Sequence, residues 1–359
     1  MKEIDDPRAK LLWRLVDRRL KIDRPTVVGI TGSLAKTSTK EAVGQMYRVR
    51  FPGQVRVGFG NLNTYLGVPL AIFGFQLDFY HRPPGRWAWG AILAQAIWRS
   101  IFDRLPKYLI LELGADRPGD IAAIVGHLPL DIAVITAVGP AHLENYPSID
   151  RIAQEKGQIL TALKPSGRGF VGPVDKYWPL YRRLAGRRPL LNVKSPLENI
   201  SQAISLQIGQ EIGLSQDQIT ETLSNQERPP GRFNLRTIGS YLVLDDSYNA
   251  NPLSMRAAIN KLSELPGSRK VARVGEMRAL GPQAARFHRQ IGRQLRSVAQ
   301  LVVGVGELAK HYRPDRWFSS PQEAAGELLA ILEDGDTILV KGSRAAKMEK
   351  IVDAIEQNV

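Results

Sequence analysis

Short apolar runs recur along the chain, and each of them ends in polar residues or glycine. The clearest are TVVGI (26–30), YLILEL (108–113), DIAVITAV (131–138), YLVLDD (241–246), LVVGVG (301–306) and DTILVKG (336–342). Continuous apolar runs of this length are typical of parallel strands that are buried on both faces. The stretches between them, such as 148–163 and 254–265, have the apolar spacing of amphipathic helices. This alternation predicts an α/β protein with largely parallel sheets.

A break near residue 230 divides this pattern in two. A chain of 359 residues is long enough for two domains. The stretch ERPPGR (227–232) interrupts the helix and strand signals with two prolines and a glycine. We therefore expect a helical extension over 1–24, a central domain over 25–230 and a smaller C-terminal domain over 231–359.

Cysteine usage and the N-terminus narrow the class of protein. The chain contains no cysteine, which excludes disulfides, thiolate zinc sites and cysteine nucleophiles. The first residues, MKEIDDPRAKLLWRLVDRRLKI, mix charges with apolar positions and lack the continuous apolar core of a signal peptide. We expect a cytoplasmic protein.

The formal net charge of +14 favours anionic partners such as nucleotides, nucleic acid, acidic lipids or phosphorylated substrates. The charge is spread along the chain, and neither zinc-finger spacing nor an RNA-recognition motif occurs. We therefore expect no specific nucleic-acid partner.

The segment 75–105 is rich in tryptophan and flanked by arginines. Its apolar stretch is too short and too interrupted for a membrane span, which needs about 20 apolar residues. An amphipathic helix that covers its own domain explains the segment, and so does a helix that binds a separate subunit or a membrane surface. The sequence leaves both open.

Residues 29–40 read GITGSLAKTSTK and lack both glycines of the strict phosphate-loop pattern G-x-x-x-x-G-K-[ST]. The stretch nevertheless joins an apolar run to a helical pattern, so its N–H groups and the positive end of the helix would face an anion. Lys36 would meet phosphate oxygens, and the hydroxyl of Thr37 could reach a magnesium ion. Taken alone, the stretch is explained equally well by an ordinary strand-to-helix turn.

Polar residues also follow other apolar runs, where open α/β sheets build their sites. Glu112 ends one run and is a candidate ligand for a hard metal ion, or a surface acid. His142 follows the next run, and a lone histidine is more often structural than a ligand. Lys156 falls on a predicted helix, where a lysine is normally a snorkelling surface residue.

Nine motifs, taken together and in order, resemble the Mur ligase family. They are GITGSxxKTSTKE, GNLNTYLGVP, LELGADRPGDI, ITAVGPAHLE, EKGQI, GRF, DDSYNANPLSM, GEMRALG and VKGSRAAKME. The DDSYNANP and VKGSR motifs are most similar to the branch that adds D-alanyl-D-alanine to UDP-N-acetylmuramoyl-tripeptide. The resemblance covers about residues 25–359. It implies a central P-loop ATPase domain with a mostly parallel sheet, followed by a Rossmann-like α/β C-terminal domain.

The resemblance also implies a set of site residues. ATP would be bound by Thr31, Gly32, Ser33, Lys36, Thr37, Ser38, Asn199, Arg232, Asp246 and Tyr248. One Mg²⁺ would be held by Thr37 and Glu112, and a second by Glu112, His142 and a Lys156 that CO2 has carbamylated. The catalytic set would be Lys36, Glu112, His142 and Lys156. The substrate site would be lined by Asn61, Asn63, Asn249, Asn251, Lys341, Ser343 and Arg344.

The implied reaction is ATP-dependent and ADP-forming: ATP phosphorylates a carboxylate, and an amine attacks the resulting acyl phosphate. The expected substrates are ATP, a UDP-muramoyl peptide or similar carboxylate, and D-Ala-D-Ala or a similar amine. Only residues 1–24 precede the loop, where the family usually has a domain that binds the UDP-sugar. The same chemistry on a different carrier is therefore an alternative, and a non-catalytic nucleotide-binding protein is another. A nucleic-acid binder is the weakest.

The loop departs from the family at its tip, where Leu34 and Ala35 replace the usual asparagine and glycine. Alanine costs little at negative φ and is strained only at positive φ. We expect Leu34 to be the more serious departure, because a bulky residue at positive φ would be strained.

Overall fold

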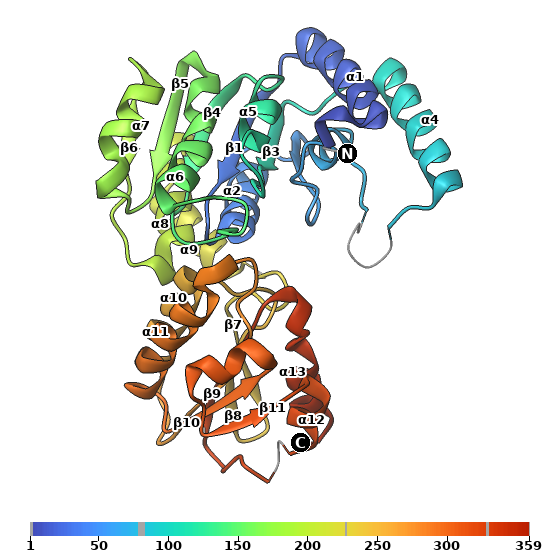
Figure 1. Cartoon of the computed structure of the whole chain (residues 1–359). Coiled ribbons are helices and arrows are strands. Elements are labelled where there is room, and N and C mark those ends of the chain that lie inside the picture. The colour runs from blue at the N-terminus through green and yellow to red at the C-terminus, as the bar shows by residue number, and fades with distance from the viewer. Residues whose placement is uncertain (1–2, 78–82, 227, 328–329, 359) are drawn as a thin grey trace. The chain divides into compact units, whose positions relative to one another are not determined.

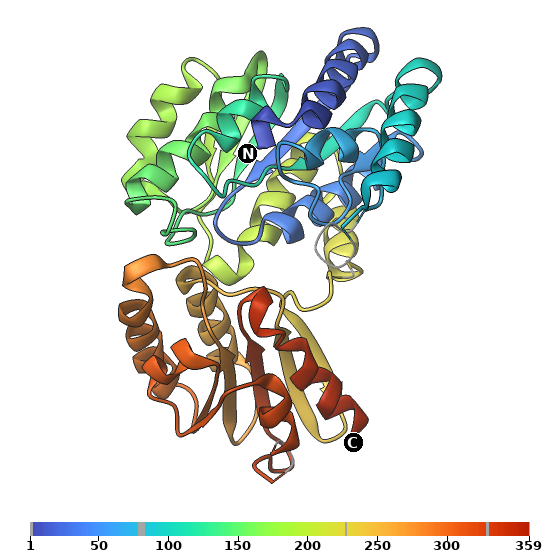
Figure 2. The ribbon, with the colours of Figure 1, turned by 45° about the vertical axis from the view of Figure 1, so that its right-hand side comes forward.

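The computed structural model describes residues 3–77, 83–226, 228–327 and 330–358. The chain forms two compact units, each built around its own sheet (Figures 1 and 2). Unit 1 comprises residues 1–138 and 150–226, and unit 2 comprises residues 139–149 and 227–359.

Unit 1 contains a six-stranded sheet in the order β2-β3-β1-β4-β5-β6, in which every pairing is parallel. Its strands are β1 (Thr26–Thr31), β2 (Val55–Val57), β3 (Tyr108–Glu112), β4 (Leu130–Ile135), β5 (Leu163–Val171) and β6 (Leu190–Asn192). Its α-helices are α1 (Pro7–Asp23), α2 (Lys36–Arg50), α3 (Gly67–Ile72), α4 (Arg86–Phe102), α5 (Asp120–Val125), α6 (Ile149–Gly157), α7 (Trp178–Ala185), α8 (Ile200–Glu211) and α9 (Gln216–Ser224). Its short 3-10 helices are η1 (Glu3–Asp5), η2 (Gln158–Ala162), η3 (Asp175–Tyr177) and η4 (Leu197–Asn199).

Helices cover both faces of this sheet, which is why its strands are apolar throughout. Val27 of β1 belongs to a core that includes α1, α3, α5 and α7. The next residue, Val28, points to the opposite face and joins a core with α2 and α8. The apolar runs are therefore continuous because the strands are buried on both faces, as the sequence predicts.

Strand β1 lies in the middle of the sheet, between β3 and β4. Since all three strands run in the same direction, their carboxyl ends meet at one edge of the sheet. The loop after Thr31, the side chain of Glu112 and the residues after Ile135 all lie at that edge.

Unit 2 contains a six-stranded sheet in the order β11-β10-β9-β12-β8-β7, in which only the β7–β8 pairing is antiparallel. Its strands are β7 (Asn234–Ile238), β8 (Tyr241–Asp246), β9 (Lys270–Gly275), β10 (Leu301–Val305), β11 (Arg316–Phe318) and β12 (Thr337–Lys341). Its helices are α10 (Pro252–Glu264), η5 (Gly281–Gln283), α11 (Ala284–Arg296), η6 (Glu307–Tyr312), α12 (Pro321–Gly326), η7 (Arg344–Ala346) and α13 (Glu349–Gln357). The predicted α/β class, with two largely parallel sheets, is confirmed.

Residues 139–149 differ from the sequence-based expectation, which placed them in the central domain. In the structure they pack with unit 2. The side chain of Leu253 lies against Gly139, and Glu144 N donates a hydrogen bond to Ala279 O at 3.4 Å. The turn residues after β4 predict a loop, but they carry no information on which core that loop contacts.

Helix α4 accounts for most of the tryptophan-rich segment; residues 78–82 of that segment lie outside the described residues. The helix buries Ile92, Ala96 and Ser100 and packs against α1. Across the described part of the chain, no helix is both long and apolar enough to cross a bilayer.

Candidate functional site

The loop between β1 and α2 is fixed against the end of β4. A Cβ at Gly32 would lie 1.9 Å from Thr136 Oγ1, so this position requires glycine. Thr136 Oγ1 donates a hydrogen bond to Leu34 O at 2.5 Å, and Ser33 N donates one to Ala137 O at 2.8 Å. The loop therefore has one backbone path, which leads directly into the first turn of α2.

The strain in this loop falls on Ala35 and not on Leu34. Ala35 has φ 60° and ψ 13°, in the left-handed region, whereas Leu34 is not among the described residues with positive φ. The expectation that Leu34 is the more serious departure is therefore wrong. A left-handed conformation costs an L-residue about 1–2 kcal/mol, because Cβ approaches the following carbonyl oxygen.

Lys36 and Ser38 form the first turn of α2. Lys36 is partly exposed, and its Nζ donates a hydrogen bond to Gly32 O at 3.1 Å, so the ammonium group folds back over the loop. Ser38 O accepts a hydrogen bond from Gln226 Nε2 at 3.4 Å. The buried hydroxyl of Thr31 has no hydrogen-bond partner among the described residues. The loop thus combines the ammonium group of Lys36, the N-terminal end of α2 and the hydroxyl of Thr31, which are groups that suit an anion.

Glu112 is bound by two other predicted residues. Thr37 Oγ1 donates to Glu112 Oε2 at 2.7 Å, and Asn63 Nδ2 donates to Glu112 Oε1 at 2.8 Å. The carboxylate is 6 % exposed, and β1–β3 pairing places it beside Ile30, at the start of the loop. A carboxylate and a hydroxyl are hard oxygen donors, so this pair fits Mg²⁺.

Lys40 is part of this arrangement, although the sequence analysis did not identify it. Its side chain is fully buried, and Nζ donates a hydrogen bond to Gly58 O at 2.5 Å. It thereby ties α2 to the loop that carries Asn61 and Asn63. Asn63 N bonds Asn61 O at 2.8 Å, and Asn61 is half-buried. The available signal was a second lysine one helical turn after Lys36.

Lys156 lies in α6 and is 2 % exposed, so it is not a snorkelling surface residue. Burial, with a smaller contribution from the positive charge of Lys36, lowers the pKa of its ammonium group to about 7, although the charges of Asp116 and Glu155 oppose this shift. Much of the amine is therefore neutral near pH 7, and a neutral amine can act as a nucleophile.

His142 lies in the 139–149 segment of unit 2, whereas Glu112 and Lys156 belong to unit 1. It has φ 54°, and its carbonyl oxygen accepts hydrogen bonds from Asn145 N and Tyr146 N. Across the described residues, no group of three His, Cys, Asp or Glu side chains is arranged to hold a metal ion. The proposed second metal set thus combines residues from both units.

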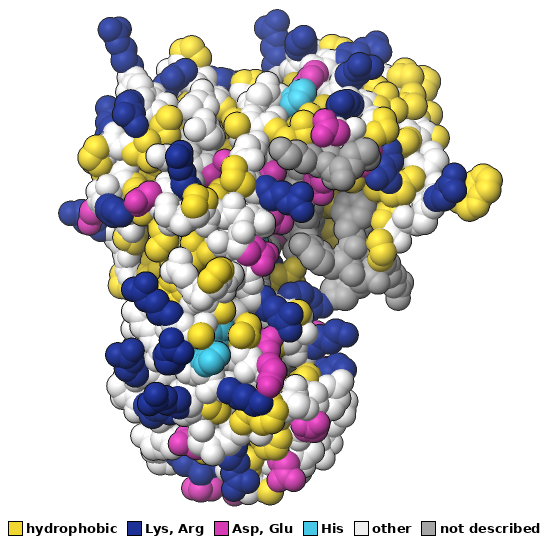
Figure 3. Space-filling model, in the orientation of Figure 1, with side chains coloured by type: hydrophobic (Ala, Val, Ile, Leu, Met, Phe, Trp, Pro, Cys, Tyr) yellow, Lys and Arg dark blue, Asp and Glu magenta, His cyan; other side chains and the backbone are white. Residues whose placement is uncertain are grey.

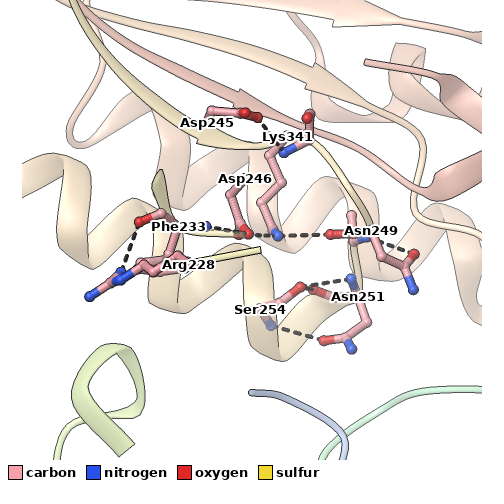
Figure 4. A network of polar contacts seen from close by, with 10 residues as sticks. Arg228, Phe233, Asp245, Asp246, Asn249, Asn251, Ser254 and Lys341 are labelled. Atoms are coloured by element: carbon pink, nitrogen blue, oxygen red, sulfur yellow. Dashed lines mark hydrogen bonds and ion pairs between the residues drawn. The ribbon is translucent and has the colours of Figure 1, made fainter. Parts of the chain in front are cut away.

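In unit 2, Asp246 and Lys341 form a buried ion pair at the ends of the neighbouring strands β8 and β12 (Figure 4). Asp246 also accepts a hydrogen bond from Phe233 N at 3.2 Å, and Lys341 Nζ donates one to Asn249 O at 2.9 Å. Burial raises the pKa of Asp246, whereas the charge of Lys341 lowers it. This pair fixes the turn that follows β8.

Two arginines lie near the ring of Tyr248 in that turn. The guanidinium carbon is 3.9 Å from the ring centroid for Arg232 and 5.3 Å for Arg344. Ser343 is 3 % exposed, and its hydroxyl has no hydrogen-bond partner within the described residues. These side chains form a cationic and polar group that suits phosphate or carboxylate.

Asn251 and Asn199 occupy helix starts. Asn251 caps α10: its Oδ1 accepts a hydrogen bond from Ser254 N at 2.9 Å, and Ser254 Oγ accepts one from Asn251 N at 3.0 Å. This structural role suffices to explain the asparagine. Asn199 is exposed at the end of η4 in unit 1 and makes no side-chain cap.

Comparison with known proteins identifies the family of this chain. Residues 92–241 match the Mur ligase middle domain, and residues 231–344 match the Mur ligase glutamate ligase domain. The chain belongs to the Mur ligase family.

Among curated proteins, this Mur ligase family member is similar to the UDP-N-acetylmuramoyl-tripeptide–D-alanyl-D-alanine ligases. It is 27 % identical to that of Escherichia coli K12 over 378 residues, which cover 92 % of this chain and 77 % of the relative. It is 26 % identical to that of Bacillus subtilis 168 over 380 residues, covering 92 % and 76 %.

Solved structures of MurF ligases have a similar fold. The MurF ligase of Thermotoga maritima, in complex with ADP, has a TM-score of 0.80 and 26 % identity, covering 97 % of this chain and 83 % of that one. A MurF structure from Acinetobacter baumannii has a TM-score of 0.81 at 24 % identity, covering 99 % and 81 %, and supports the fold.

Proposed function

We propose that this chain is an ATP-dependent, ADP-forming amide ligase that makes a C–N bond in peptidoglycan precursor synthesis. It would add D-Ala-D-Ala to the peptide carboxylate of a UDP-muramoyl peptide. The observation that carries the proposal is the Lys36 loop with the Thr37–Glu112–Asn63 cluster beside it. The names of the relatives and the ADP-bound MurF support it.

The chain's own residues have defined tasks in this proposal. The loop amides and Lys36 would hold the β and γ phosphates of ATP and neutralise charge during transfer. The γ-phosphoryl group would move from ATP to the substrate carboxylate, and ADP would leave. The amine would then attack the acyl carbon, lose a proton and displace phosphate. No protein nucleophile is needed, because positioning and electrostatics provide the catalysis.

Magnesium would be held by Thr37 and Glu112, whose oxygens fit it, and would supply Lewis-acid stabilisation to the phosphoryl group. A second ion would use Glu112, His142 and Lys156. A lysine can serve a cation only after its charge is removed. The buried, partly neutral amine of Lys156 is suited to carbamylation by CO2, which would give it anionic oxygens.

The remaining predicted residues stay proposals. Asn199, Arg232, Asp246 and Tyr248 would complete the ATP site together with the loop residues Thr31 to Ser38. Asn61, Asn63, Asn249, Asn251, Lys341, Ser343 and Arg344 would face the substrates. The Asp246–Lys341 pair supports these assignments, because it fixes the turn after β8 that carries Tyr248 and Asn249.

Phosphate release tests the proposal. Phosphate should form only when ATP, UDP-muramoyl tripeptide and D-Ala-D-Ala are all present, and Lys36→Ala should abolish it. Release with other carboxylate and amine pairs alone would favour the same chemistry on a different carrier. ATP binding without turnover on any pair would favour a non-catalytic nucleotide-binding protein.

The proposal also covers the compartment of the protein and a surface for contacts. We propose the cytoplasm as the compartment, because ATP is the expected substrate. We also propose that segment 75–105 contacts a separate subunit or a membrane surface, because α4 exposes large apolar side chains.

A further inference from the structure

Helix α4 carries an apolar stripe on its outward face. Trp87, Ala91, Ala94, Trp98 and Ile101 follow helical spacing and therefore lie on one side of the helix. All five are exposed, and the exposed fractions are 95 % for Trp87, 54 % for Trp98 and 52 % for Ile101. An exposed apolar surface of this kind usually marks an interaction site. We call these five residues the apolar stripe.

The charges of α4 are exclusively basic. Its sequence RWAWGAILAQAIWRSIF contains two arginines and no acid. Arg99 turns inward, where it donates a hydrogen bond to Phe73 O at 2.6 Å and lies 4.7 Å from the centroid of the Phe75 ring. Arg86 is exposed at the start of the helix. The apolar stripe is thus free of charge along its length and has a cation at one end.

Helix α1 carries a cationic stripe. Lys10, Arg14, Arg18 and Lys21 are all exposed and lie on one side of that helix. The opposite side is buried in the core of unit 1. Of the two acids in α1, Asp17 lies near this row, and its carboxylate is 3.0 Å from His127 Nδ1. We call these four residues the cationic stripe.

The two helices lie side by side at the edge of unit 1 (Figures 1 and 2). Arg8 of α1 lies 4.4 Å from the ring centroid of Trp89 in α4. In Figure 3, lysines and arginines gather over α1 and hydrophobic side chains over α4.

The carboxyl-terminal ends of both helices line one open hollow of about 550 Å³. Ile22 and Phe102, 57 % and 67 % exposed, lie there beside the exposed Arg104 and Lys107. Of the two acids in the hollow, Asp23 is held by Arg19, and Asp103 is exposed. Apolar and basic side chains therefore share one surface.

From this arrangement we infer that α1 and α4 dock unit 1 onto an anionic lipid bilayer. The apolar stripe would enter the boundary between headgroups and acyl chains, and the cationic stripe would bind headgroup phosphates. Trp87 and Trp98 have the amphipathic rings that favour this depth. A second copy of the chain fits less well, because a symmetric contact would bring two cationic stripes together. This inference extends the proposal that segment 75–105 contacts a partner, and it does not depend on enzymatic turnover.

Vesicle co-sedimentation tests the inference on the full chain. Binding should be strong with phosphatidylcholine vesicles that contain phosphatidylglycerol, weak with phosphatidylcholine alone, and reduced by salt. The triple variant Arg14→Gln, Arg18→Gln, Lys21→Gln should lose roughly 100-fold in affinity, since each basic residue near such a surface contributes about fivefold. The double variant Trp87→Ser, Trp98→Ser should lose at least about tenfold through lost apolar burial.

A matched control separates this surface from overall charge. Helix α11 in unit 2 exposes Arg286, Arg289 and Arg293, and replacing these three by glutamine removes the same charge elsewhere. This variant should bind vesicles like the original chain. Equal loss in the control, equal binding to neutral vesicles, or no vesicle binding at all would overturn the inference. So would a dimer that the tryptophan variant dissociates without any vesicle binding.

Phosphate release is measured in parallel on every variant. All of these variants should retain turnover, because none of the substituted residues belongs to the proposed site. Absence of turnover in the original chain with vesicle binding intact would therefore count against the ligase proposal alone.

Discussion

Ala35 adopts a left-handed conformation because the residues around it leave no other path. Thr136 holds Leu34 O, and Thr39 N donates a hydrogen bond to Ala35 O at 2.9 Å in the first turn of α2. The chain must turn from the end of β1 into α2 within the few residues between them. The substitution of glycine by alanine therefore changes the energy of the turn more than its shape.

Ala35→Gly should stabilise the protein by about 0.5–1 kcal/mol, which is the relief of left-handed strain less the greater freedom of glycine in the unfolded chain. Chemical denaturation of the two proteins measures the difference. Ala42→Gly, in the buried middle of α2, is the control and should destabilise by at least about 1 kcal/mol. A destabilising Ala35→Gly substitution would show that φ at this position is negative in solution.

The proposed carbamylation of Lys156 by CO2 should depend on pH. We expect a carbamate signal in carbon-13 NMR after addition of labelled bicarbonate, which decreases as the pH falls through about 7 and the amine is protonated. Lys156→Met should remove the signal. Lys36→Met should move its midpoint to higher pH, because the charge of Lys36 lowers the pKa of Lys156. A signal that survives in Lys156→Met would assign the carbamate to another amine.

The lowered pKa of Lys156 should also make the free energy of unfolding depend on pH. Its pKa is about 7 in the folded chain and 10.5 in the reference state, so the unfolded chain binds more protons between these values. The free energy of unfolding should therefore rise with pH across this window, and it should rise less in Lys156→Met. Thermal denaturation of both proteins from pH 7 to pH 10 measures the difference; equal slopes would contradict a depressed pKa.

At the level of elements, the sequence predicts the buried strands best. β1, β3, β4, β8, β10 and β12 lie where continuous apolar runs occur, because both of their faces are covered. β2 is a three-residue edge strand, partly exposed throughout, so no apolar run identifies it. The helix predicted over 148–163 is α-helical only to Gly157 and continues as the 3-10 helix η2 to Ala162. At Gly157, Tyr181 and Leu184 leave no room for a side chain. Such tertiary contacts are not visible in local spacing.

Lys40 links two elements, and Lys40→Met should loosen the loop that carries Asn63. Loss of a buried, charge-assisted hydrogen bond to Gly58 O should cost about 1.5–3 kcal/mol in the free energy of unfolding. The displaced Asn63 would orient Glu112 less well, so kcat/KM should fall by about tenfold. Denaturation and steady-state phosphate release measure the two effects.

Glu41→Gln is the control for this substitution. It removes the ion pair with Lys40 and leaves the bond to Gly58 intact, and it should cost less than about 1 kcal/mol because Glu41 is partly exposed. If Lys40→Met were as stable and active as the original chain, the bond to Gly58 would have no role in positioning the loop.

For the whole molecule, the residues that the proposal assigns to the ATP site belong to two different cores. The sequence motifs place their residues in order, but order along the chain does not determine which core each segment joins. The loop with Lys36 and Thr37 belongs to unit 1, whereas Arg232, Asp246 and Tyr248 belong to unit 2. His142 shows the same limit, since its segment belongs to unit 2 although the residues before and after it in the sequence belong to unit 1.

Nucleotide binding should therefore stabilise both units. A ligand present at 100 times its Kd and bound only by the folded state adds about 2.7 kcal/mol to the free energy of opening. With Mg²⁺ and a non-hydrolysable ATP analogue, amide hydrogen exchange should slow both in β4 of unit 1 and in β9 of unit 2, two strands that are buried except at Asp131 and Lys270. Lys36→Ala should remove the protection in both, because the phosphate contacts are lost. Protection confined to β4 would mean that unit 1 binds the nucleotide alone, and Arg232, Asp246 and Tyr248 would then have to be assigned to another part of the reaction.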